Sequence, residues 1–256
     1  MKIATWNVNS IRARLGAVLD WLGEASPDVV LLQEIKTIAA GFPELEIGDL
    51  GYNVAVCGQK TYNGVAILAK RPIEDVTLRL PGDDEDAEAR YVEAVVGDVR
   101  VASIYVPQGT ELGSARFAYK LAFLERVHGH AKSLLAYEEA FVLGGDYNVA
   151  PGPEDVYDAK GLDGTLCYHP DERAGLRKIT YLGLTDAFRA LNDEAASYSW
   201  WDYRGRGWER DHGMRLDHLL LSPQAADRLE ASGIDRGPRG RPKASDHTPV
   251  WCELRE

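Results

Sequence analysis

Short apolar runs that end in polar residues recur from one end of this chain to the other, and they restrict its fold more than any other feature. Such short apolar runs predict buried or half-buried strands. Gly97-Asp98 separates two of the runs and predicts a hairpin turn. The runs are "KIATWNVN" (2–9), "DVVLLQE" (28–34), "YNVAVCG" (52–58), "GVAILAK" (64–70), "EDVTLRL" (74–80), "ARYVEAVVG" (89–97), "VRVASIYV" (99–106), "AFVLGGDYN" (140–148), "YSWWDY" (198–203), "RLDHLLLS" (215–222) and "TPVWCEL" (248–254).

Helical periodicity is clear in one long segment and weaker in two short ones. The long helix is expected to run to Leu135, with Ser114 as its N-cap. Shorter helices are expected over Arg12–Leu22, capped by Ser10, and near Leu184–Leu191. The apolar stripe of the long helix consists of Phe117, Leu121, Leu124, His128, Ala131 and Leu135, and His128 is interpreted there as a packing residue.

Strands dominate the pattern, and no repeat of fixed period is present. We therefore expect two mixed or largely antiparallel β-sheets packed face to face with helices outside, a layered α/β sandwich. The segment that follows "AFVLGGDYN" and ends at about Ala174 is expected to be mostly loop. The 256 residues contain no Pro/Gly/Ser-rich linker, and their number suits one large domain as well as two small ones. A single domain over residues 1–256 is the interpretation adopted.

Several classes of protein are disfavoured by what the chain contains. Cys57, Cys167 and Cys252 lie far apart and form no CxxC or Cys/His spacing, so reduced thiols in a cytoplasmic protein are expected rather than a zinc site or disulfides. No apolar run approaches the roughly 20 residues of a membrane span. The N-terminus enters a strand directly, so no signal peptide is expected.

The charge distribution argues against a protein that coats DNA nonspecifically. The formal net charge is −11, and five of the acidic residues fall in "PGDDEDAE" (81–88). A uniformly basic surface is what nonspecific binding to a polyanion requires. The segment "RGPRGRPK" (236–243), however, carries four bases and no acid. This pattern suits an enzyme that contacts a few phosphates and uses a divalent metal for further positive charge.

Polar side chains stand at the ends of the apolar runs, where burial is costly for them. Desolvating a carboxylate costs several kcal/mol unless it is paired, hydrogen-bonded or metal-bound. Convergence on a single cleft explains so many such positions better than a series of ordinary turns. Carboxylate oxygens without thiolates also suit Mg²⁺ or Mn²⁺. The residues concerned are Asn7, Asn9, Glu34, Tyr105, Asp146, Asn148, Asp217, Asp246 and His247.

These residues fit metal-assisted phosphodiester hydrolysis without a covalent intermediate. Glu34 and Asp246 are the expected metal ligands. His247 is expected to contact the scissile phosphate, with its tautomer held by Asp217. Asp146 is expected to orient or deprotonate the attacking water, or to assist the leaving oxygen. The expected hydrogen-bond donors to phosphate oxygens are Asn7, Tyr105 and Asn148.

Nine stretches of the chain resemble exonuclease III, the class II apurinic/apyrimidinic endonuclease family of base excision repair, within the wider endonuclease/exonuclease/phosphatase superfamily. The resemblance implies a four-layered α/β sandwich, a metal ligand role for Asn9 beside Glu34 and Asp246, and Mg²⁺ or Mn²⁺ as cofactor. It also implies cleavage of duplex DNA 5′ to abasic sites, 3′→5′ degradation and removal of blocked 3′ ends. A monomer is expected because this chemistry needs only one chain. The stretches are "WNVNSIRAR", "LLQEIK", "YNGVAIL", "YVPQG", "GGDYNVAP", "LTDAFR", "YSWWDYR", "RLDHLLLS" and "SDHTPVW".

The balance of activities stays open at this level. Pancreatic-type deoxyribonucleases of the superfamily have a second catalytic histidine in the region of "YVPQG", where this chain has Tyr105, as exonuclease III does. Some relatives keep the catalytic set and have lost abasic-site cleavage, so a chain biased toward exonuclease action is the alternative. Two further rivals are a phosphodiesterase or phosphatase acting on small molecules and a DNA-binding module without turnover.

Residues outside the catalytic set are expected to contact DNA. In "YSWWDYRGRGWERDHGMR" (198–215) aromatic residues alternate with arginines. One tryptophan is expected to line a pocket for a base-less sugar, while the arginines contact phosphates; the alternative is that the Trp pair is core and the basic loop is merely solvated. His169 and His212 receive no catalytic role. The DNA-binding candidates are Trp200, Trp201, Arg204, Arg206, Arg239 and Arg241.

Overall fold

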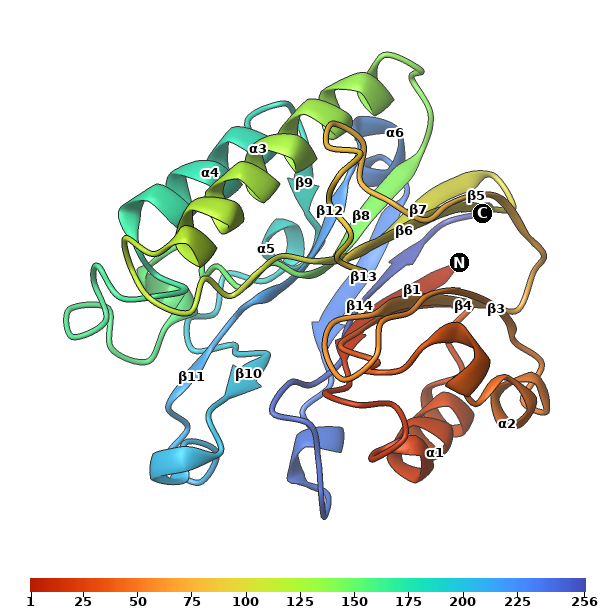
Figure 1. Cartoon of the computed structure of the whole chain (residues 1–256), viewed down its shortest axis with the longest axis horizontal. Coiled ribbons are helices and arrows are strands. Elements are labelled where there is room, and N and C mark those ends of the chain that lie inside the picture. Colours follow the sequence, from red (N-terminus) through yellow and green to blue (C-terminus); the bar gives the residue numbers. More distant parts are fainter.

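Two six-stranded sheets pack face to face in the computed structural model, which describes residues 1–256 (Figure 1). Both are mixed: β1 and β2 are parallel in the first, β7 and β8 in the second, and the remaining pairs are antiparallel. The first sheet has the order β13 (Leu229–Ile234), β14 (Val250–Leu254), β1 (Lys2–Asn7), β2 (Val29–Gln33), β4 (Val65–Ala69), β3 (Asn53–Cys57). The second has the order β5 (Ile73–Thr77), β6 (Tyr91–Val96), β7 (Val99–Tyr105), β8 (Phe141–Asp146), β12 (Asp217–Leu221), β9 (Thr185–Asp186).

Helices cover the two outer faces, which confirms the α/β sandwich and gives it four layers. One apolar cluster fills the space between the sheets, and one lies between each sheet and its helices. In Figure 1 α3 and α4 lie together over the second sheet, while α1 and α2 lie below the first. No helix is both long and apolar enough to cross a membrane. The helices are α1 (Leu15–Ala25), α2 (Glu44–Gly48), α3 (Ala115–Leu135), α4 (Pro170–Thr180), α5 (Ala187–Leu191) and α6 (Pro223–Ala226).

The long helix confirms its expected cap but not its whole expected stripe. The Ser114 hydroxyl accepts a hydrogen bond from the amide of Phe117, as an N-cap does. His128 is only half-buried and lies near Glu125, so its interpretation as a core packing residue is wrong. The apolar face is turned slightly relative to the expectation, and the buried residues are Phe117, Lys120, Phe123, Leu124, Val127, Ala131 and Leu134.

Other boundaries also differ from the sequence prediction. Helix α1 begins at Leu15 rather than Arg12, and Ser10 is not its cap. Helix α4 occupies part of the segment predicted as loop, and the helix expected near Leu184 begins only at Ala187. Strand β13 was not predicted. Its residues are mostly half-buried at the edge of the sheet, so they lack the apolar run by which the other strands are recognised.

The two glycines of "GGDYN" lie inside β8, where their lack of a side chain lets neighbouring groups approach. A Cβ on Gly145 would lie 1.9 Å from the carbonyl oxygen of Ile104. A Cβ on Gly144 would lie 2.5 Å from Leu31 and 2.6 Å from Leu219. The glycines are therefore required by packing at the centre of the sandwich, and they carry β8 to its last residue, Asp146.

Candidate active site

Strand register brings the polar ends of the apolar runs to one edge of the sandwich. Asp146 ends β8, and it is paired on one side with Tyr105, which ends β7, and on the other with Asp217, which begins the antiparallel β12. Asn7 and Gln33 end the parallel strands β1 and β2 of the facing sheet. The sequence predicted convergence on a single cleft, and the topology brings Tyr105, Asp146 and Asp217 into register at this edge.

The amide of Asn7 connects the two sheets. Its Nδ2 donates to Oε1 of Glu34 at 2.8 Å and to Oδ2 of Asp146 at 2.9 Å. Asp146 is almost completely buried and also accepts from the backbone amide of Asn148 at 2.8 Å. The Tyr105 hydroxyl donates to the same Glu34 oxygen at 2.9 Å. Asn7 thus fixes the separation of two carboxylates that come from different sheets.

A carboxylate–histidine pair stands beside Asp146. Nδ1 of His247 lies 2.8 Å from Oδ2 of Asp217, and its Nε2 lies 3.6 Å from Oδ2 of Asp146. Asp217 is fully buried and also accepts from the hydroxyl of Ser199 at 2.6 Å. The ring is therefore held between two acids, and its Nδ1 is directed away from the cavity.

The charges of this group are strongly coupled. Burial lowers the pKa of His247, but the carboxylates of Asp217 and Asp146 outweigh it and raise that pKa to about 10. Burial raises the pKa of Asp146 to about 7, with the imidazolium of His247 opposing and Asp217 adding to the rise. At neutral pH the site therefore holds an imidazolium beside a carboxyl group that is poised to accept or release a proton.

Oxygen ligands for a cation face each other across the cavity. Asn9 donates from Nδ2 to Oδ1 of Asp246 at 2.9 Å, and its Oδ1 is directed toward Lys36. The Lys36 ammonium lies 2.6 Å from Oδ1 of Asn9 and 2.8 Å from Oε2 of Glu34. A cationic group of this chain thus already binds two of the three predicted metal ligands, so the donor set suits a hard cation. Asp146, Asp217 and His247 also offer ligand atoms within 4.8 Å of one another.

The two carboxylates of this set are held in their charged forms. Burial raises the pKa of Glu34, but the Lys36 ammonium and the Asn7 amide outweigh it, so the pKa is lowered. Burial likewise raises the pKa of Asp246, while the charge of His247 and the hydrogen bond from Asn9 produce a net lowering. Both are thus anionic at neutral pH, as cation binding requires.

Three site residues have left-handed backbone conformations, which are uncommon for residues other than glycine. The φ angles are 44° at Asn9, 49° at Glu34 and 50° at Asn148. Each residue directly follows the end of a strand or lies within two residues of it. Such strain persists only where the surrounding structure enforces it, and here it turns the side chains out of the strand direction and toward the cavity.

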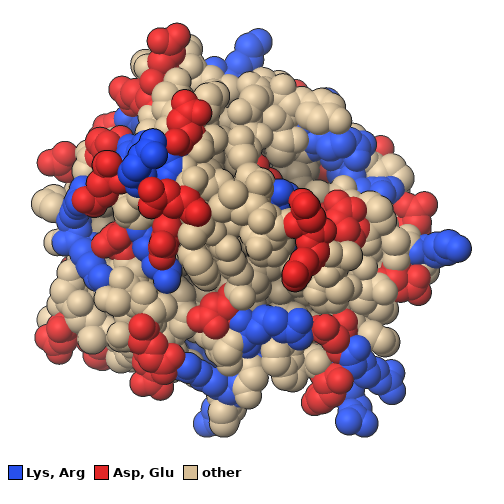
Figure 2. Space-filling model, turned by 180° about the vertical axis from the view of Figure 1, so that it is seen from behind, with Lys and Arg blue, Asp and Glu red and all other residues tan.

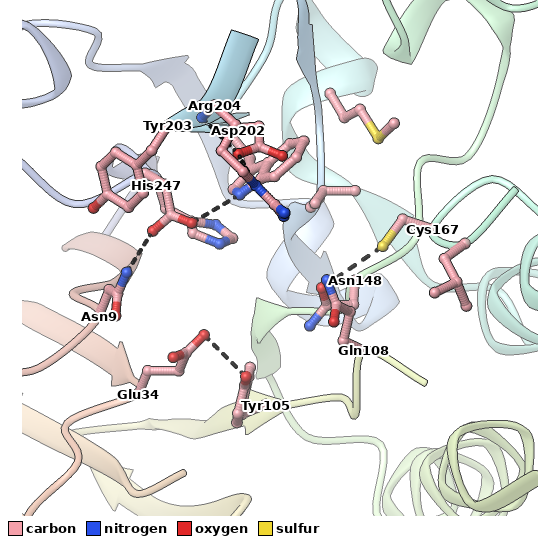
Figure 3. Close-up of a pocket in the computed structure, with 15 residues that line it drawn as sticks. Asn9, Glu34, Tyr105, Gln108, Asn148, Cys167, Asp202, Tyr203, Arg204 and His247 are labelled. Atoms are coloured by element: carbon pink, nitrogen blue, oxygen red, sulfur yellow. Dashed lines mark hydrogen bonds and ion pairs between the residues drawn. The ribbon is translucent and has the colours of Figure 1, made fainter. Parts of the chain in front are cut away.

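A cavity of about 530 Å³ opens over these groups (Figure 3). In Figure 3 Glu34 and Tyr105 lie on one side, Asn148 and Gln108 on another, and Asn9 and His247 face them. Trp200 also lines the cavity and donates from Nε1 to Oδ2 of Asp246 at 3.0 Å. Apolar atoms of Leu166, Cys167, Met214 and Leu216 complete the wall.

The six predicted DNA-binding residues fall into different environments. Trp200 and Arg204 line the cavity, and Arg206 is exposed nearby on the same loop. Trp201 is fully buried and donates from Nε1 to Asp211, so the expectation that it contacts DNA is wrong: alternation along the short strand β10 (Trp200–Trp201) turns one ring inward. Between these two tryptophans, the structure therefore selects Trp200.

The other two arginines are engaged by the protein itself. Arg239 is buried, and its guanidinium lies over Tyr203 and Trp208, 5.3 Å from each ring centroid. Its predicted phosphate contact does not fit this burial. Arg241 is half-buried and pairs with Glu24 on α1 at 2.5 Å. Arg239 thus packs within the loop before β14, and Arg241 ties that loop to the first helix.

The sequence prediction missed several residues that support the site. Lys36 was quoted in "LLQEIK" without a role, although a cation two residues after Glu34 is a usable signal. Ser199 holds Asp217, and no local pattern marks it. Lys120 is completely buried under the cavity, where its ammonium donates to the carbonyl oxygens of Asn148 at 2.7 Å and Gln108 at 3.1 Å. A lysine in a helix gives no hint of such a position.

Charged side chains are mixed on the face opposite to the view of Figure 1. Figure 2 shows acidic and basic groups interspersed there without a continuous basic patch. This agrees with the net charge of −11 and with the argument against nonspecific coating of DNA.

A two-sheet α/β sandwich with acids, amides and one imidazolium at the strand ends defines a hydrolase that acts on phosphate esters. The family model described as "Endonuclease/Exonuclease/phosphatase family" matches residues 4–247, and the chain belongs to this family. It is 32% identical to exodeoxyribonuclease III of Haemophilus influenzae, with both chains covered completely. The resemblance inferred from the sequence motifs is thereby confirmed.

Two solved structures are similar over nearly the whole chain. The AP endonuclease from Archaeoglobus fulgidus is 38% identical, with a TM-score of 0.95 and 99% of each chain covered. The 3′ phosphatase NExo from Neisseria, bound to a product DNA hairpin, is 36% identical, with a TM-score of 0.97 and both chains covered completely. These relatives place the chain among hydrolytic nucleases.

Proposed function

We propose that this protein hydrolyses phosphodiester bonds of duplex DNA in base excision repair, cleaving 5′ to abasic sites and removing nucleotides or blocking groups from 3′ ends. The observation that carries the proposal is the Asn7 bridge, which joins the buried Asp146 of one sheet to Glu34 of the other, and Glu34 lines the same cavity as Trp200. The activities named for the exodeoxyribonuclease III, AP endonuclease and 3′ phosphatase relatives support it.

A divalent cation, Mg²⁺ or Mn²⁺, is proposed as cofactor. Glu34 and Asp246 would hold it, with the amide oxygen of Asn9 as a third ligand and Lys36 displaced from between Glu34 and Asn9. When bound, such an ion neutralises charge on the phosphate and on the departing oxygen. The contacts that Lys36 makes with two of these ligands support this assignment.

The remaining groups are proposed to act on the phosphate and on water. The His247 imidazolium donates from Nε2 to a non-bridging phosphate oxygen, while Asp217 keeps the proton on Nδ1. Asp146 orients the attacking water and accepts its proton, for which a pKa near working pH is favourable. Asn148, Tyr105 and Asn7 donate hydrogen bonds that hold the phosphate and the acids in place.

The test uses a labelled duplex with one abasic-site analogue, incubated with Mg²⁺, with Mn²⁺ or with EDTA, beside a matched duplex without the lesion. Incision on the 5′ side of the lesion that EDTA abolishes would support the full proposal. Stepwise 3′ shortening of both duplexes alone would identify an exonuclease-biased member of the family. Turnover of inositol phosphates without DNA cleavage would favour the small-molecule rival, and DNA binding without cleavage in either metal would favour a binding module.

Three further expectations remain proposals. Both sheets contribute residues to one cavity, which supports a single domain over residues 1–256. A monomer is proposed as the active form because the proposed chemistry needs only one chain. A cytoplasmic location stays a prediction from the sequence.

A further inference from the structure

A second cavity of about 430 Å³ adjoins the candidate active site, and none of the roles above uses it. It shares Trp200, Asp202, Arg204 and Met214 with the active-site cavity. Trp200 and Met214 are paired residues of the two-stranded ribbon formed by β10 and β11 (Gly213–Met214), so this ribbon is the common wall. The volume lies within the usual range of about 300–1,000 Å³ for small-molecule sites.

Two aromatic rings are stacked in the lining of this cavity. The rings of Tyr157 and His212 are almost parallel, with an interplanar angle of 3° and centroids 4.4 Å apart. Tyr157 is 41% exposed, and His212 is also exposed. Flat aromatic faces that are open to solvent are the surfaces on which nucleobases stack in proteins that bind single strands.

Backbone contacts already hold the segments that carry these rings. The amide of Tyr157 donates to the carbonyl oxygen of Gly213 at 3.1 Å, and Val156 forms a β-bridge with Met214. The amide of His212 donates to the carbonyl oxygen of Gly207 at 2.8 Å. The two side chains are therefore not needed to fix the loops, and their exposed rings are available for a ligand.

Cationic side chains border the same cavity. Arg204 lines both cavities, and its side chain is 91% exposed. Arg210 lines the second cavity and is exposed as well. Exposed arginines beside an aromatic platform are suited to phosphates on either side of a stacked base. The ligand that this combination fits is a nucleotide, not an apolar molecule.

We propose that the second cavity binds an unpaired nucleobase of the DNA strand whose phosphate lies in the active site. The base stacks on the Tyr157–His212 pair, and Arg204 and Arg210 contact the adjoining phosphates. A base can stack on these rings only after it has left the duplex stack, so a paired base does not enter. The inference rests on the proposed function in requiring DNA as the substrate.

The experiment compares two hairpin duplexes, one ending in an unpaired 3′ 2-aminopurine and the other with that base paired. Both are titrated with the full chain carrying Asp146→Asn, which is expected to leave the DNA uncleaved in Mg²⁺. Adding Tyr157→Ala is expected to weaken binding of the unpaired end about tenfold, from the loss of one stacking contact, and to abolish the quenching of 2-aminopurine fluorescence. Binding of the paired duplex is expected to stay unchanged.

Control variants separate stacking from structural damage. Tyr157→Phe keeps the ring and is expected to bind like the parent, and Tyr137→Ala, a tyrosine that is 69% exposed at the opposite end of β8 from Asp146, is expected to have no effect. Equal losses for both duplexes, or a loss in Tyr157→Phe as large as in Tyr157→Ala, would overturn the inference. So would unchanged binding in Tyr157→Ala and His212→Ala alike. If the Asp146→Asn chain binds both duplexes but the wild-type protein cleaves neither, the proposed function is contradicted and the inference about the second cavity is not.

Discussion

Replacing Asp217 by Asn removes the charge that controls His247 while keeping the shape of the side chain. In the wild type the Asp217 carboxylate accepts from Nδ1 of His247 at 2.8 Å and from Ser199 at 2.6 Å, inside a fully buried environment. Burial alone would lower the pKa of His247, and the carboxylates of Asp217 and Asp146 raise it to about 10. The imidazolium is therefore lost only as the pH rises through that value.

The size of the effect follows from the hydrogen bond that changes. A buried hydrogen bond to a charged partner contributes about 1.5–3 kcal/mol, and about 1.4 kcal/mol corresponds to one pKa unit. Asp217→Asn should thus lower the pKa of His247 by about one to two units, because Asp146 still favours the charged ring. The alkaline limit of activity should fall by the same amount. At pH 9 the charged fraction of His247 should drop from about 0.9 to between about 0.5 and 0.1, so turnover should fall about 2- to 10-fold.

The measurement is an NMR titration of ¹⁵N-labelled imidazoles in metal-free protein, with His247→Gln used to assign the resonance. A pH profile of nuclease turnover is recorded in parallel. Ser199→Ala is the matched control, because it removes a hydrogen bond from a neutral donor to the same carboxylate but keeps the Asp217 charge, and it should shift the pKa of His247 by less than about one unit. A His247 pKa in Asp217→Asn within about half a unit of wild type would refute the reasoning.

Three further perturbations test other parts of the argument. Asp146→Asn should leave the melting temperature nearly unchanged and lower turnover by several orders of magnitude, since the proton acceptor is lost without a change of shape; wild-type cleavage would reject the assignment. Gly145→Ala should destabilise the protein by about 3 kcal/mol in urea unfolding, because the new Cβ would lie 1.9 Å from a carbonyl oxygen, whereas Gly129→Ala, where no atom lies within 4 Å, should not destabilise it. Burial raises the pKa of Glu88, but Arg116 and Arg90 outweigh it and lower the pKa to about 2. The ion pairs of Glu88 therefore stabilise the protein above the pKa that Glu88 has in the unfolded chain, and this stabilisation is lost as the pH falls toward 2. Between about pH 5 and pH 2 the free energy of unfolding should drop less in Glu88→Gln than in wild type. Equal slopes would show that Glu88 is unpaired in solution.

Local signals in the sequence determined the elements and most of the proposed catalytic set. Apolar runs of strand length located 11 of the 14 strands, and Ser114 marked the start of α3 correctly because a cap acts within one turn. The acids that follow buried runs, such as Glu34 and Asp146, could be selected because an unpaired carboxylate there would be too costly. These inferences depend on neighbours in sequence, which the chain itself supplies.

Local patterns were less informative where the periodicity was weak. Helix α4 begins with Pro170, and its N-cap is His169, whose ring accepts from the amide of Asp171; an imidazole is an unusual cap, and the segment was predicted as loop. The edge strand β13 lacks an apolar run because only part of each residue is covered. Such elements are stabilised mainly by the tertiary contacts around them.

Only the tertiary structure decided which groups meet. Asn7 and Asp146 are 139 residues apart in sequence, and the close approach that links them arises from the packing of two sheets. The same packing buries Trp201 and leaves Trp200 in the cavity, withdraws Arg239 from solvent, and places Lys36 between Glu34 and Asn9. Residue type and spacing state what each side chain can do, but distance and burial set its charge and its partners, and these are properties of the folded chain.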